Sequence, residues 1–221
     1  MFKPRQPLRY SRSEYISDAV VHVSGLTLAM IAAPILVTLT AVWIGDARAV
    51  TAVTIYAVSL ITMLLCSALY NMIKHAEWSD RLRRLDQSAI YLKIAGTYTP
   101  FLMLTSTKAG WILVAIWVMA LAGAALIFFA RQSFLYLAIA LYLGLGWIGV
   151  VFWGPALSGL SMPAIALVIS AGVTYTIGVL FLIWQRLPHH VTIWHVFVLV
   201  ASAKAYAAVM IELIRMASVT A

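Results

Sequence analysis

Polar and ionisable side chains recur at helical spacing within apolar stretches of this sequence. Asp18 and His22 are four residues apart, so both lie on one face of a helix that contains them. Ser67 and Asn71 have the same spacing. If these stretches cross a membrane, each ionisable group among them is a candidate for function. Such groups are rare in membrane spans because removing them from water is costly.

A carboxylate and an ammonium group stand two helical turns apart further along the chain. Asp86 and Lys93 are seven residues apart, and side chains lean toward the N-terminus of their helix, so we expect Lys93 to reach back and form an ion pair with Asp86. His195 lies at the start of the last apolar stretch. Lys204 follows nine residues later, on about the opposite helix face, which predicts a separate role or an extension toward a polar zone.

The composition indicates an integral membrane protein. The chain has 221 residues, of which 64% are hydrophobic and 10% are charged, with a mean hydropathy of +0.98. A soluble domain has about 25% charged residues and needs a polar surface, which argues against a soluble enzyme or a nucleic-acid-binding domain. The net charge is +8. The basic residues that produce it lie mostly between apolar stretches, where such residues set the topology and contact anionic lipid headgroups. Cys66 is the single cysteine, so no internal disulfide forms.

The apolar stretches predict an all-α fold, a seven-transmembrane-helix bundle forming one domain over residues 1–221. A bilayer core about 30 Å thick needs about 20 apolar residues per helix. Seven stretches meet this requirement: 19–44, 49–73, 88–106, 111–130, 133–153, 160–184 and 191–213. Arg131 and Gln132 divide the long stretch between residues 111 and 153, which predicts a tight helical hairpin there.

The basic residues predict the orientation of the bundle. With seven spans, ten of them fall on the side of the N-terminus: Lys3, Arg5, Arg9, Arg12, Lys74, Arg81, Arg83, Arg84, Arg131 and Arg186. The opposite side has Arg48, Lys108 and Arg215. The positive-inside rule then places the N-terminus in the cytoplasm and the C-terminus outside.

This orientation brings the polar residues of several spans to one depth near the cytoplasmic face, with Asp18 among them. We expect a polar cluster there, made of His22, Ser67, Asn71, Asp86, Lys93 and His195. The polarity is concentrated at one end, whereas a water-filled channel needs polar side chains along its length. The pattern favours a half-buried pocket.

Several sequence blocks, in order along the chain, resemble those of the hemolysin III proteins, the bacterial branch of the progestin and adipoQ receptor superfamily. The strongest runs from Arg83 to Leu102 and reads RRLDQSAIYLKIAGTYTPFL. Others are DAVVHVSG from Asp18, SALYN from Ser67 and IWHVFVL from Ile193. The resemblance implies a seven-helix bundle with a cytoplasmic N-terminus, in the bacterial cytoplasmic (inner) membrane.

The resemblance also implies a metal site, usually zinc, near the cytoplasmic face. The family pattern has a serine and, four residues later, a histidine in span two, an aspartate at the start of span three and two histidines at the start of span seven. Ser67, Asp86 and His195 match this pattern. Neutral imidazoles bind zinc, and a carboxylate can hold the metal-bound water.

The sequence departs from the family pattern at the other ligand positions. Asn71 and Val191 stand where histidines are expected, and His190 is one residue out of register. Gln87 and Ala205 occupy two more positions where histidine is common. We therefore predict a degenerate site and no firmly bound cofactor.

Zinc is the alternative, held weakly by Asp86 and His195 unless His190, His189 or His22 joins them. The favoured function is non-enzymatic sensing or modulation of membrane lipid state, with membrane lipids or a lipid-like molecule as ligand. The resemblance implies two alternatives. One is a zinc-dependent hydrolase of lipid amide or ester bonds, using Ser67 and Asp86. The other is a cytolytic pore, as the family name suggests.

Overall fold

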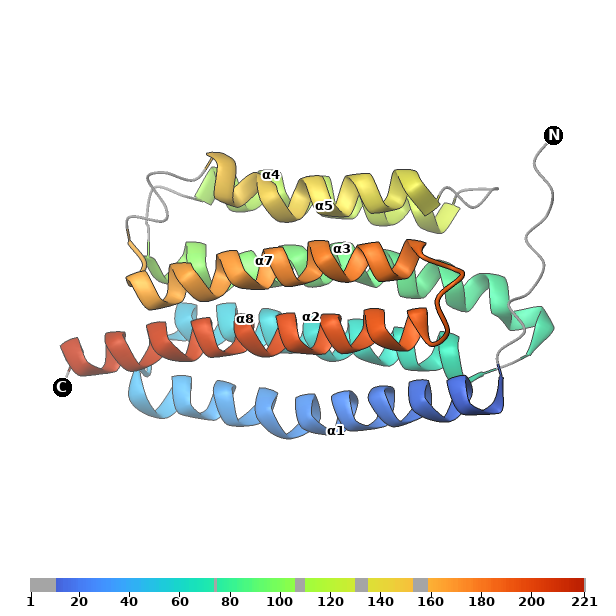
Figure 1. The fold of residues 1–221 in the computed structure, drawn as a ribbon. Coiled ribbons are helices and arrows are strands. Elements are labelled where there is room, and N and C mark those ends of the chain that lie inside the picture. Colours follow the sequence, from blue (N-terminus) through green and yellow to red (C-terminus); the bar gives the residue numbers. More distant parts are fainter. Residues whose placement is uncertain (1–10, 74, 106–109, 130–134, 153–158, 221) are drawn as a thin grey trace.

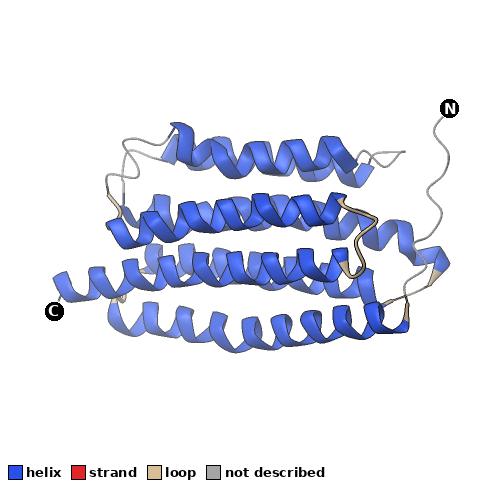
Figure 2. Ribbon diagram, viewed as in Figure 1, coloured by secondary structure: helices blue, strands red, loops and turns tan. Residues whose placement is uncertain are grey.

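The computed structural model describes residues 11–73, 75–105, 110–129, 135–152 and 159–220. Within these ranges the protein is helical, without strands (Figure 2). The helices are α1 (Arg12–Trp43), α2 (Ala47–Met72), α3 (Ala76–Thr105), α4 (Gly110–Phe129), α5 (Leu135–Phe152), α7 (Met162–Ile183) and α8 (His190–Thr220).

The helices lie side by side in stacked pairs (Figure 1). The pair α4 and α5 is at one side, followed by α3 with α7 and then α2 with α8, and α1 lies on the far side. Helix α3 contacts α2, α4, α5 and α8, whereas α1 packs mainly on α2 and α8. Helix α1 begins and helix α8 ends at opposite ends of the bundle.

Capping residues fix where three of the helices begin. Ser11 and Glu14 form a capping box at α1, in which each side chain accepts from the other residue's backbone N–H. Asp46 accepts from the backbone N–H of Ala49 at the start of α2, and Ser161 caps α7 in the same way. These caps satisfy N–H groups that have no partner within the helix.

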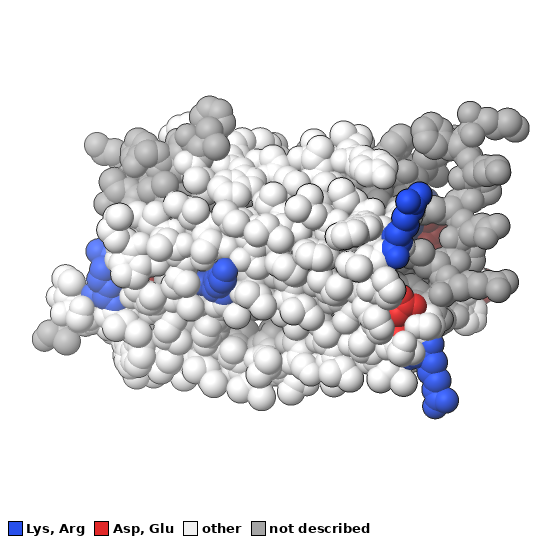
Figure 3. All heavy atoms as spheres, viewed as in Figure 1, with Lys and Arg blue, Asp and Glu red and all other residues white. Residues whose placement is uncertain are grey.

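The outer surface of the bundle is apolar. Helices α1, α2, α4, α7 and α8 are long and apolar enough to cross a membrane, and α5 contains a shorter apolar stretch over residues 136–150. Large side chains such as Leu28, Val42 and Val58 point outward, with 66%, 73% and 57% of their surface exposed. The face shown in Figure 3 carries few charged side chains between its two ends. The predicted class, an all-helical membrane protein, agrees with these features.

Helix α3 differs from its predicted span. It begins at Ala76, twelve residues before the predicted 88–106, so Arg83 and Arg84 lie on a helix and not in a loop. Both arginines pair with Asp80, at 2.5 and 2.7 Å, across one helical turn. These contacts, chiefly the hydrogen bond from Arg83, lower the pKa of the Asp80 carboxyl below its ordinary value. The polar helix start lacks the hydropathy that marks a span, although local ion pairs support it.

The remaining predicted spans agree with the helices to within a few residues, apart from helix ends such as the first turns of α1 and the last turns of α8. The predicted hairpin at Arg131 and Gln132 lies outside the described residues. Arg131 is one of six basic residues used for the orientation that lie outside the described residues, and the other five are Lys3, Arg5, Arg9, Lys74 and Lys108.

Candidate functional site

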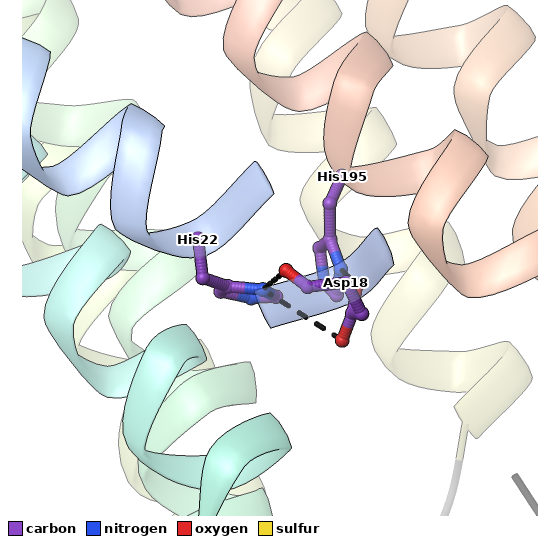
Figure 4. Close-up of side chains that lie close together, drawn as sticks. All are labelled: Asp18, His22 and His195. Carbon is purple, nitrogen blue, oxygen red and sulfur yellow. Dashed lines mark hydrogen bonds and ion pairs between the residues drawn. The ribbon is translucent and has the colours of Figure 1, made fainter. Parts of the chain in front are cut away.

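Two histidines from the first and last helices meet at one buried carboxylate. On α1, His22 Nδ1 lies 2.8 Å from the backbone oxygen of Asp18, one turn earlier. On α8, His195 Nδ1 lies 2.8 Å from Oδ1 of Asp18. The two imidazole rings are 4.3 Å apart and packed edge to face. Figure 4 shows the three side chains converging from the two helices, and all three are buried.

These hydrogen bonds define which ring nitrogens are available for binding. A backbone oxygen and a carboxylate oxygen both accept, so Nδ1 of His22 and Nδ1 of His195 carry the hydrogens. In a neutral imidazole the lone pair then belongs to Nε2. Both Nε2 atoms face the same hydroxyl, because Ser67 Oγ lies 3.3 Å from that of His22 and 3.5 Å from that of His195. Two nitrogens with lone pairs, each able to bind a metal, are therefore directed into one small region.

Helix α2 supplies the polar side chains on the other side of this region. Asn71 donates from Nδ2 to the backbone oxygen of Ser67 at 2.9 Å. This contact is possible because the two residues are four apart and therefore lie one helical turn apart on one face, as predicted. The same Nδ2 lies 3.5 Å from Nε2 of His22. Asn71 thus lies beside His22 at the position where the family pattern has a third imidazole.

Asp86 of α3 completes the polar region. It is half-buried, and it lines one cavity together with His22, Ser67 and His195. Its carboxyl interacts with Ser67 and with His195. Residues from α1, α2, α3 and α8 therefore contribute to one polar cluster. It differs from the predicted set by including Asp18 and leaving out Lys93. From here on, the cluster denotes Asp18, His22, Ser67, Asn71, Asp86 and His195.

The cluster has a suitable donor set for a divalent metal. Ligand atoms of Asp18, His22 and His195 lie within 4.8 Å of one another. Asp18, however, already accepts from Nδ1 of His195, the position of a carboxylate that orients a metal-binding histidine. The chemistry of the donors thus fits a metal held by the two Nε2 atoms, with Asp18 in the orienting role. Asp86, a predicted ligand, lines the same cavity but is not among the three described residues whose ligand atoms lie this close together.

Two candidate residues lie elsewhere. His190 is buried at the start of α8, and it lines a second pocket with Glu14 and Arg186, away from the cluster. His189 has a positive φ of 59°, and its backbone N–H donates to Glu14 Oε1 at 3.1 Å. His190 is one residue from the family position at 191, and on a helix this directs it to another face than His195. The histidine that lies beside His195 is His22 of α1.

The expected ion pair between Asp86 and Lys93 is absent among the described residues. Both side chains line the same cavity, but the ammonium of Lys93 lies 4.8 Å from the ring centre of Tyr175 on α7. Lys204 is directed away from the cluster, as its helix face predicts. Its ammonium donates to Thr174 Oγ1 at 2.7 Å.

The sequence placed Asp18 at the depth of the predicted cluster and one turn from His22, but Asp18 was not assigned as a member of the site. A signal was present, since an aspartate at the start of a predicted span needs a partner. The partner, His195, is 177 residues away in the chain, so it can be identified only once α1 and α8 are known to be neighbours.

A cavity of about 160 Å³ extends from the cluster into the bundle. It runs along α3 from Asp86 to Phe101, between α5, α7 and α8. Apart from Lys93 and the cluster, its walls are mainly apolar and aromatic, and they include Tyr142, Trp147, Tyr175 and Trp194.

Comparisons with known proteins agree with the resemblance noted in the sequence. A family model described as haemolysin-III related matches residues 11–206. The chain is 36% identical to the hemolysin-3 homolog of Bacillus subtilis (strain 168) over 199 residues, which are 89% of this chain and 93% of that protein. It is 38% identical to hemolysin-3 of Bacillus cereus over 207 residues, 93% of this chain and 94% of that protein.

Proposed function

Because the chain belongs to the haemolysin-III related family, we propose that it is a multi-pass protein of the bacterial cytoplasmic membrane that binds a lipid-like molecule inside its bundle. Its role is to sense or modulate the lipid state of the membrane without catalysis. The observation that carries this proposal is the cavity, because an apolar chamber with a polar end suits one amphipathic molecule.

We further propose that all seven described helices cross the membrane, with the N-terminus in the cytoplasm and the C-terminus outside. Two features support this. Helix α1 begins and α8 ends at opposite ends of the bundle, and the cluster lies at the end where the basic residues predict the cytoplasm.

Two glycines of α5 provide a test of ligand binding in the cavity. A Cβ added at Gly146 or at Gly144 meets no other atom within 4 Å, so the backbone tolerates a side chain at both. Only Gly146 lines the cavity; Gly144 is exposed on the outer surface. We therefore expect Gly146→Leu to occupy the ligand's space, whereas Gly144→Leu leaves the cavity open.

The measurement is photo-crosslinking in nanodiscs with a single-chain lipid alcohol that carries a diazirine, followed by peptide mass spectrometry. Wild type and Gly144→Leu should be labelled on cavity-wall peptides. Gly146→Leu should lose that labelling by roughly tenfold or more, equivalent to about 1.4 kcal/mol of binding. Labelling of the outer surface of α4 is the internal control. Equal cavity labelling in all three proteins would contradict the proposal.

The second candidate function is a metal-dependent hydrolase of lipid amide or ester bonds. The specific observation is that Nε2 of His22 and Nε2 of His195 are directed at the same region beside Ser67. These imidazoles would hold zinc, with Asp86 on the same cavity wall, and the metal would supply Lewis-acid chemistry and an activated water when bound. In this function Asp18 orients His195, and the cavity receives the acyl chain.

Metal analysis of gently purified protein separates the two functions. A hydrolase should contain near-stoichiometric zinc, and His22→Ala or His195→Ala should remove most of it. Asn71→His should tighten zinc binding by about 10–100-fold, because it adds an imidazole beside His22. His190→Ala is the control and should retain the metal. Zinc-free wild type, with no gain in Asn71→His, would exclude this candidate and leave lipid binding intact.

A cytolytic pore, suggested by the relatives' names, receives less support. Among the described residues, side chains such as Leu36, Val53 and Leu102, each at most 1% exposed, pack near the end of the bundle opposite the cluster. The cavity that reaches toward them has mainly apolar walls, which favours a lipid-binding pocket over a water-filled path.

A further inference from the structure

Lys93 carries a charge inside the cavity that the cluster does not use. Only 4% of its surface is exposed, and it lies among the cavity-lining residues of α3. The described residues that line this cavity include no other lysine or arginine. They provide no ion pair for Lys93, although Asp86 lies on the same wall.

Two hydroxyl groups close to Lys93 in the fold form hydrogen bonds with groups other than its ammonium. Tyr175 places its ring beside the ammonium, but its hydroxyl shares a 2.7 Å hydrogen bond with Ser202. Thr97 donates its hydroxyl to the backbone oxygen of Lys93 at 2.8 Å. An ammonium has three N–H donors. In the described part of the chain, the side-chain contact seen for this ammonium is the ring of Tyr175, so a molecule in the cavity can accept from it.

Burying an ammonium without a negative partner is costly, and a cation–π contact recovers only part of that cost. A ligand with a negative headgroup would supply the missing charge. At 1.5 Å per residue, the backbone of Lys93 lies about 10 Å deeper in the bundle than that of Asp86. Its ammonium lies against the ring of Tyr175, and the cavity wall further along α3 includes Ile94 and Phe101.

We propose that the cavity selects a single-chain amphiphile with one negative charge, whose headgroup pairs with the ammonium of Lys93. This inference rests on the proposed function, since it requires that the cavity bind a lipid-like molecule. One charge is specified because the described cavity wall supplies one ammonium; a doubly charged phosphate would require a second cation. The acyl chain then follows α3 along Ile94, Thr97 and Phe101.

The test compares two diazirine probes with the same sixteen-carbon chain, one ending in a carboxylate and one in an alcohol. In nanodiscs of uncharged lipid, wild type should bind the carboxylate roughly 10–100-fold more tightly, as expected for a charge-assisted hydrogen bond. Lys93→Met should lose this preference while still binding the alcohol. Lys93→Arg should keep the preference. Lys204→Met, which removes a lysine outside the cavity, should match wild type.

The outcomes distinguish the two proposals. Equal affinity for both probes in wild type, or an unchanged preference in Lys93→Met, would overturn the role of Lys93 while leaving lipid binding intact. If neither probe labels the cavity wall, the proposed function fails as well. An alkyl phosphate of the same length is the third probe, and tighter binding of it at a pH where it is doubly charged would overturn the selection for one charge.

Discussion

Replacing Asp18 by alanine is expected to lower the free energy of unfolding by about 3 kcal/mol, within the range for breaking a buried charged hydrogen bond. Asp18 is 4% exposed, and its carboxylate accepts from His195 Nδ1 at 2.8 Å. The substitution leaves that N–H buried without an acceptor and removes a direct link between α1 and α8. Equilibrium unfolding in mixed micelles measures the loss.

Two further variants separate this contact from general effects of removing a carboxylate. Asp18→Asn keeps an oxygen that can accept from His195, so about two-thirds of the loss should be recovered, and nitrogen NMR should still show His195 protonated at Nδ1. Asp80→Ala removes an exposed carboxylate and should change stability by less than about 1 kcal/mol. If Asp18→Ala is as stable as Asp80→Ala, the contact contributes little.

Replacing Gly96 by alanine should destabilise the bundle by about 2–3 kcal/mol, because the added methyl group overpacks a close helix contact. A Cβ at this position would lie 2.0 Å from Oγ and 2.6 Å from Cβ of Ser59 on α2. Ser59 is buried, and α2 and α3 pack along their lengths. The helices must therefore separate, since the side chain of Ser59 is too short to turn away. Thermal unfolding of purified protein measures the effect.

The compensating variant Ser59→Gly should restore much of the stability lost in Gly96→Ala. With Ser59 reduced to glycine, the nearest remaining atom to the new Cβ is the backbone oxygen of Ile55, at 3.4 Å. Ser59→Gly alone should cost about 1 kcal/mol, so the two changes should be strongly non-additive. Gly110→Ala meets no atom within 4 Å and is the neutral control. An additive double variant would show that the close contact does not limit packing.

The composition and spacing of residues predicted much of this architecture. A shortage of charged residues indicated membrane helices, because a bilayer replaces the polar surface of a soluble protein. The four-residue spacings of Asp18 with His22 and of Ser67 with Asn71 placed each pair on one helix face. The structure turns those two faces toward each other, so that Ser67 Oγ lies 3.3 Å from His22 Nε2.

The partners of individual side chains were harder to predict, since spacing within one helix does not reveal its neighbours. Lys93 was expected to pair with Asp86 on its own helix, yet it lies over Tyr175 of α7. His190 was considered as a replacement ligand because it is one residue from Val191, where the family pattern has a histidine. His22 lies beside His195 because α1 packs against α8. The residues around His22 and around His195 do not reveal by themselves that these two helices are neighbours.

The packing of α1 against α8 can form only late in the synthesis of the protein. A ribosome delivers the chain from its N-terminus, so α1 enters the bilayer first and α8 last. While the intervening helices are being synthesised, Asp18 lacks its hydrogen-bond partner, because His195 has not yet been added to the chain. The polar cluster is therefore a product of complete translation. A chain that stops before α8 keeps a carboxylate in its first helix and lacks the imidazole that would donate to it.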